Sequence, residues 1–187
     1  MHQPRPLRSD AARRRDAVLD AAVAIFGDQG IDAPLDLVAE RAGVGRATLY
    51  RSFPDREALL IAVLSRELEA LEHLSASLGD RPDRVFDLLG ALAEQLVRTS
   101  AVAEAMRRAR VDPAALASIH ARLGEVFAAP MAEAQAAGRL RPDLTPQDAV
   151  LIVRMLGGAL GGAASPLATP ARTLDLLVAG LRGAAHG

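Results

Sequence analysis

The fold is decided by residues 35–60, LDLVAERAGVGRATLYRSFPDREALL, whose pattern predicts two short helices joined by a tight turn. Apolar residues recur at helical spacing until Gly43, because glycine enters the left-handed conformation at a helix end without steric cost. A second short helix follows over residues 46–52, with Leu49 facing the first helix. The small side chain of Ala39 lets the two helices cross closely. This spacing is typical of a helix-turn-helix.

The second helix of a helix-turn-helix enters the major groove of DNA. Its outer surface combines arginine, threonine and tyrosine, which suit guanine edges, thymine methyl groups and phosphates. We predict that Arg46 reads a base and that phosphates are held by Thr48, Tyr50 and Arg56. The complete predicted DNA contact set is Arg13, Arg14, Arg46, Ala47, Thr48, Tyr50, Arg51 and Arg56. An ordinary corner of two helices is the alternative, and the continuation of the pattern through Phe53 argues against it.

Residues 39–60, AERAGVGRATLYRSFPDREALL, resemble the N-terminal signature of TetR-type transcriptional regulators. The resemblance begins at residues 13–30, RRRDAVLDAAVAIFGDQG, and these two stretches lie in the first third of the chain. It implies that the last two helices form a dimer interface. Pro34 stands where the family usually has a helix-capping threonine, so we expect Asp36 to serve the amides of the first turn.

The composition bounds the class of protein. The 187 residues suffice for one or two domains with a hydrophobic core. Half of them are apolar and the formal net charge is −1, which excludes a disordered chain and a uniformly basic coat protein. The absence of cysteine excludes disulfides and thiolate metal sites. With no secretory leader, and with an apolar run over 149–164 that is interrupted by Arg154, we expect a cytoplasmic protein that does not enter a membrane.

The N-terminal segment is basic. The first fifteen residues hold five arginines and one acidic residue, Asp10. A cationic arm beside a groove-reading helix can contact phosphates or enter the minor groove. A solvated tail is an alternative of equal weight. A first helix is expected over residues 10–29, ended by Gly30.

The rest of the chain is predicted to be helical, with no strand signal. The starts are marked by Asp55 as an N-terminal cap, and by prolines that follow Asp112, Thr145 and Thr169. The expected helices cover residues 55–78, 85–97, 101–110, 113–137, 146–164 and 170–183. With those of the head they give an all-α fold of about nine helices. We expect a three-helix DNA-binding head over 1–56 and a helical ligand-binding and dimerisation body over 57–187.

The eighth helix is apolar on almost every side, whereas a surface helix shows a polar face. Its GGALGG run costs about 1 kcal/mol of helix propensity for each glycine, which is tolerated where another backbone approaches closely. We predict a homodimer held by the last two helices of each subunit, packed as a four-helix bundle. The residues predicted at this interface are Leu156, Gly158, Gly162, Leu174, Leu177 and Leu181. An entirely intramolecular core is the alternative.

The middle helices are predicted to enclose a pocket for a small-molecule effector. Its predicted lining is Phe86, Leu89, Met106, His120, Leu123 and Phe127. His120 lies on the apolar face of its helix, between Leu116 and Leu123, where a hydrogen-bonded core histidine is the more frequent role. The sequence indicates a small apolar or amphipathic effector and does not identify it.

Catalysis is not expected, and neither is a cofactor or a metal ion. The four histidines are scattered, and the sequence has no HExxH motif, paired cysteines or glycine-rich phosphate loop. We predict a transcriptional repressor that binds double-stranded palindromic operator DNA and is released by its effector. Two alternatives remain open: an architectural DNA-binding dimer without an effector and, more distantly, a helical enzyme.

Overall fold

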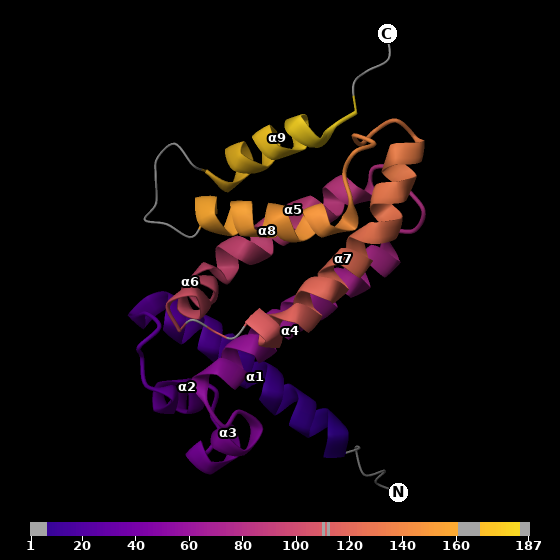
Figure 1. Ribbon diagram of the computed structural model, residues 1–187. Helices are drawn as coiled ribbons and strands as arrows, with labels where there is room; N and C mark the ends of the chain where they lie inside the picture. Colours follow the sequence, from indigo (N-terminus) through magenta and orange to yellow (C-terminus); the bar gives the residue numbers. More distant parts are fainter. Residues whose placement is uncertain (1–6, 110, 112, 161–168, 184–187) are drawn as a thin grey trace, which may run out of the picture.

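The computed structural model describes residues 7–109, 111, 113–160 and 169–183, which form nine α-helices (Figure 1). The helices are α1 (Leu7–Gln29), α2 (Leu35–Arg41), α3 (Arg46–Ser52), α4 (Arg56–Ser77), α5 (Arg84–Arg98), α6 (Ser100–Ala109), α7 (Pro113–Ala136), α8 (Pro146–Leu160) and α9 (Pro170–Leu181). The prediction of an all-α fold is confirmed. Positions 161–164, where the eighth helix was expected to continue, lie outside the described residues. Within the described helices, none is long and apolar enough to cross a membrane.

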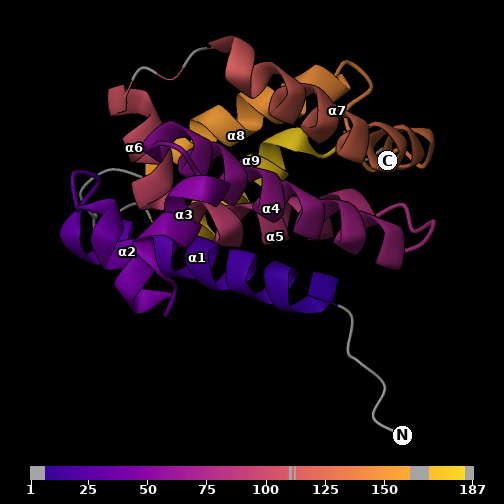
Figure 2. The ribbon, with the colours of Figure 1, turned by 90° about the horizontal axis from the view of Figure 1, so that it is seen from below.

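The head consists of α1, α2 and α3 and lies at the opposite end of the molecule from α8 and α9 (Figure 1). The view from below looks onto these three helices (Figure 2). α4 starts in the head and runs into the body, where it packs against α5 and α7. Because its 22 residues span about 33 Å, one rigid element joins the two parts.

The turn between α2 and α3 follows from its sequence. Gly43 has a φ of 65°, the left-handed conformation that ends α2. The backbone N–H of Val44 donates to the carbonyl of Ala39 at 3.0 Å and closes the turn. Val38 and Leu49, at 0% and 1% exposure, then meet in the core of the head. The predicted helix-turn-helix is therefore present.

Two clusters of buried apolar side chains divide within α4. The head cluster extends along α4 to Val63, and the body cluster begins at Leu68. Val102 and Met106 of α6 belong to the head cluster, so α6 packs on the head although it follows α5 in the chain. The functional boundary between residues 56 and 57 remains a prediction.

The structure corrects the predicted orientation of α8 and α9. Leu156 and Leu181 are 2% and 8% exposed, and they pack in the body cluster. Leu174 and Leu177 are half-buried against the same cluster. These four residues therefore attach α8 and α9 to their own subunit. A helix that is apolar on all sides does not reveal from its sequence which side its own domain covers.

Other apolar side chains on these helices face outward. Leu151, Met155 and Leu176 are 53%, 56% and 57% exposed. Of the two predicted interface glycines, Gly158 lies in α8 at a position whose surroundings the structure does not describe, and Gly162 lies outside the described residues.

Candidate DNA-binding face and effector cavity

The side chains of α3 divide between the core and the surface. Leu49 is buried against α1 and α2, and this fixes the rotation of the helix. Four of the predicted DNA contacts consequently face solvent: Arg46, Ala47, Tyr50 and Arg51. Thr48 is half-buried, and its hydroxyl accepts a hydrogen bond from Arg51 at 3.3 Å. The exposed face of α3 thus has the form of a recognition helix.

Arg46 forms an ion pair with Asp36 of α2, with 3.0 Å between Nη1 and Oδ2. The Arg46 side chain is 73% exposed, so DNA can replace this partner. The same contact corrects the expectation that Asp36 caps the start of α2. The cap residue Pro34 makes no side-chain hydrogen bond there, and the Asp36 carboxylate is directed toward Arg46.

The basic start of α1 lies beside α3. Arg14, Arg15 and Thr48 are among the residues around a cavity of about 110 Å³ between the two helices. The guanidinium of Arg15 lies 5.2 Å from the ring centroid of Phe53. Arg13 pairs with Asp10 one turn earlier on α1. Sequence reasoning did not assign Arg15 a role, because its contact joins residues 38 positions apart and leaves no local pattern.

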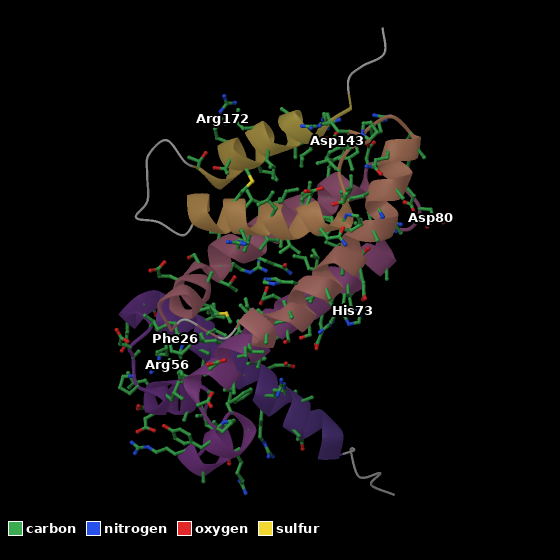
Figure 3. The ribbon with its side chains drawn as sticks, in the orientation of Figure 1. Phe26, Arg56, His73, Asp80, Asp143 and Arg172 are labelled. Atoms are coloured by element: carbon green, nitrogen blue, oxygen red, sulfur yellow. The ribbon has the colours of Figure 1, made fainter. Side chains whose placement is uncertain are left out.

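Arg56 has partners inside the head. Its guanidinium donates to the backbone carbonyls of Ile31 and Ala33, the latter at 2.7 Å, and lies over the ring of Phe26 (Figure 3). The expectation of a phosphate contact was based on the unfavourable position of an arginine in the first turn of α4. The two carbonyls account for that position without DNA. We therefore leave Arg56 out of the proposed DNA contacts.

The body contains a second cavity of about 110 Å³, bounded by α4, α5, α7 and α8. His120 and Leu123 of α7 line it, as predicted for an effector pocket. Three polar residues that sequence reasoning did not place there also line it: Glu67, Gln95 and Thr99. A polar residue at a buried position of an apolar helix was the available signal for Gln95, which is 8% exposed.

The other four predicted pocket residues lie elsewhere. Leu89 and Phe127, at 2% and 1% exposure, fill the body cluster. Phe86 is covered by the guanidinium of Arg182, 4.6 Å from its ring centroid. Met106 belongs to the head cluster. Helical spacing identifies the apolar face of each helix, but not which part of that face remains unfilled.

A wider, open groove of about 360 Å³ follows the outer side of α4 and α7. Arg122 of α7 crosses it with two hydrogen bonds to the carboxylate of Glu72, at 3.0 and 2.9 Å. These bonds raise the pKa of the Arg122 guanidinium above its ordinary value. The groove is therefore bridged by an ion pair that ties α7 to α4.

The head, its exposed recognition helix and the helical body define a DNA-binding regulator of the helix-turn-helix class. Residues 18–63 match the family described as bacterial regulatory proteins, tetR family. Residues 82–183 match the C-terminal domain of SbtR-like transcriptional regulators. The chain belongs to the TetR family of bacterial transcriptional regulators. Members of this family are DNA-binding regulators and not enzymes.

Similar proteins agree with this assignment. The transcriptional repressor KstR of Mycolicibacterium smegmatis is 40% identical over 111 residues, which cover 56% of this chain and 54% of KstR. The chain thus spans about half the length of this curated relative. A TetR regulator of Mycobacterium vanbaalenii is 30% identical, with a TM-score of 0.63 over 95% of this chain and 99% of its own. One from Streptomyces coelicolor is 31% identical, with a TM-score of 0.67 over 91% and 99%.

Proposed function

We propose that this protein is a repressor that binds a palindromic operator as a homodimer and is released by a small effector in the body. The observation that carries the DNA-binding part is the exposed face of α3, where Arg46, Tyr50 and Arg51 surround a helix fixed by buried Leu49. Arg46 is the proposed base-reading residue. Arg13, Arg14, Ala47 and Thr48 complete the proposed contact surface.

The outward apolar side chains of α8 and α9 support self-association. Leu151 and Met155 are one helical turn apart, so they share a face of α8. Exposed apolar side chains of this size are costly in water unless a partner covers them. We place Leu151, Met155 and Leu176 in the dimer interface. The KstR relatives, which are named repressors, support the repressor role.

The effector is proposed to enter the cavity lined by His120 and Leu123. This cavity touches α4, which starts in the head, so a ligand that displaces α4 changes the position of the head. The cavity volume of about 110 Å³ is below the range of about 300–1,000 Å³ usual for drug-sized ligands. A ligand of that size therefore requires the surrounding helices to move apart.

Selection of DNA from a random library with the full-length protein tests this function. The expected result is one enriched motif with two inverted half-sites, whose centres lie about 34–36 Å apart or a whole-turn multiple of that distance. Effector screening on that operator follows. Enrichment of no sequence would contradict the proposal, and binding to all sequences alike would favour an architectural DNA-binding protein.

A further inference from the structure

The effector cavity is apolar and contains one charged residue, which is acidic. Of the twelve described residues that line it, eight are apolar and three are polar without a formal charge. Glu67 of α4 is the twelfth, and no arginine is among them. Two arginines contact Glu67, but they approach it from positions outside this lining.

Two of the uncharged polar side chains are already engaged. The side-chain amide of Gln95 donates to the backbone carbonyl of Glu67 at 3.0 Å. The hydroxyl of Thr99 donates to the carbonyl of Gln95 at 2.8 Å. The imidazole of His120, by contrast, makes no hydrogen bond to any residue whose side chain the structure describes.

The carboxylate of Glu67 retains capacity to accept hydrogen bonds. Its side chain is 17% exposed. The nearest guanidinium nitrogens lie at 3.5 Å for Arg66 and 3.3 Å for Arg98. Both distances exceed the 2.7–2.9 Å or so of a strong charged hydrogen bond. A carboxylate offers about four lone-pair positions, so neither contact saturates it.

We infer that the effector is an amphipathic amine, with an ammonium group at the carboxylate of Glu67 and an apolar body against the leucines of the cavity. An anionic ligand is disfavoured, because a second negative charge in a water-poor cavity would face Glu67 without a lining cation to balance it. This inference rests on the proposed function, since it specifies the effector of the same cavity.

A series of probes with one chain length and different head groups tests it. Hexylammonium, 1-hexanol and hexanoate are titrated onto the full-length protein by calorimetry. We expect hexylammonium to bind about tenfold or more tighter than hexanoate, the fold-change of one charge-assisted hydrogen bond. Glu67→Gln should remove most of this preference. The matched control is Glu69→Gln, since Glu69 is exposed on the same helix and lies outside the cavity lining.

Several outcomes would overturn the inference: hexanoate binding as tightly as hexylammonium, no binding of hexylammonium, or an unchanged preference in Glu67→Gln. If circular dichroism shows that Glu67→Gln does not fold, Glu67→Asp decides, because a retained carboxylate should retain the preference and a lost preference contradicts the assignment. Operator selection gives a separate reading. A protein that enriches no operator but prefers hexylammonium contradicts the proposed function only, whereas operator binding without the preference contradicts the inference only.

Discussion

The guanidinium of Arg56 lies over the ring of Phe26, with 5.2 Å between its central carbon and the ring centroid. The same group donates to the carbonyls of Ile31 and Ala33, which follow α1. Arg56 therefore fixes the first turn of α4 against the end of α1. A residue of the sequence signature thus has a structural contact that α4 requires to hold the head in place.

Arg56→Ala should destabilise the head. The variant loses a cation over an aromatic ring and leaves two carbonyls without their donor, at a cost of about 1–3 kcal/mol in the free energy of unfolding. Urea unfolding measures this cost. Arg51→Ala is the control, because Arg51 is exposed on α3 and should leave the stability unchanged. A stable Arg56→Ala protein whose operator binding has a flatter salt dependence would instead return Arg56 to the phosphate contacts.

Arg46→Ala should weaken binding to the selected operator by about 1–3 kcal/mol and relax the preference at one base pair. The ion pair with Asp36 does not prevent this role, since an exposed pair contributes only about 0–1 kcal/mol. Binding to a panel of single-base operator variants provides the measurement. Arg172→Ala, at the opposite end of the molecule, is the control (Figure 3). Equal weakening on every sequence would make Arg46 a phosphate contact.

The elements that could be predicted from the sequence are those with local causes. Asp55 caps α4 by accepting from the N–H of Ala58 at 2.8 Å, and Thr169 caps α9 through the N–H of Arg172. Gly30 and Gly138 adopt positive φ at the helix ends where glycine was expected. Each signal lies within a few residues of its effect, so no knowledge of the packing was needed.

The features that the sequence did not reveal depend on contacts between distant segments. The direction of the Arg56 side chain is set by residues 23 and 25 positions earlier. The side of α8 that carries Leu156 was misassigned, because burial of that side follows from packing against α5 and α7. Glu67 had no signal, since an acidic residue on α4 is compatible with solvent and with a cavity alike.

Charge placed on the outward face of α8 or α9 should separate the dimer. Leu151→Glu and Leu176→Glu are expected to sediment as monomers, because two carboxylates would be desolvated across the two-fold axis. Operator affinity should fall by about 10²–10⁴-fold, since the second head no longer binds within the same complex. Ala70→Glu, at an exposed position of α4, is the control. An intact dimer in both leucine variants would place the interface elsewhere.

Asp148 should contribute stability that is lost in acid. Its carboxylate accepts from the N–H and the hydroxyl of Thr145, at 2.7 and 2.8 Å, and these bonds lower the pKa of Asp148. A lowered pKa gives stability above the unfolded-state value and loses it as the pH falls through the folded-state value. Asp148→Ala should therefore cost about 0.3–1.5 kcal/mol at pH 7, with the difference from wild type shrinking below about pH 4.

Thermal unfolding across this pH range gives the measurement. Asp80→Ala serves as the control, because Asp80 is exposed in the loop before α5. A difference between Asp148→Ala and wild type that stays constant down to pH 2 would show that the carboxylate charge is not the cause.

The cavity and the head are joined by a chain of charged contacts along α4. Arg66 donates to Asp20 of α1 at 2.7 Å and to the backbone carbonyl of Asp16 at 3.3 Å, while its other nitrogen faces Glu67. A cation that engages Glu67 competes with Arg66 and so loosens its hold on α1. The effector can act only through a difference in affinity between the two positions of the head.

Asp20→Asn should therefore weaken the switch without weakening the ligand. We expect the dissociation constant for hexylammonium to stay unchanged, while its effect on operator affinity falls from the usual coupling of about 1–3 kcal/mol toward zero. Asp28→Asn is the matched control, since Asp28 lies on α1 and pairs with Arg41 inside the head at 3.9 Å. Ligand titrations with and without operator supply the second reading, because linkage requires operator to weaken ligand binding by the same factor. Full coupling in Asp20→Asn would exclude the Arg66 contact as the route, and equal ligand affinity with and without operator in wild type would exclude the switch itself.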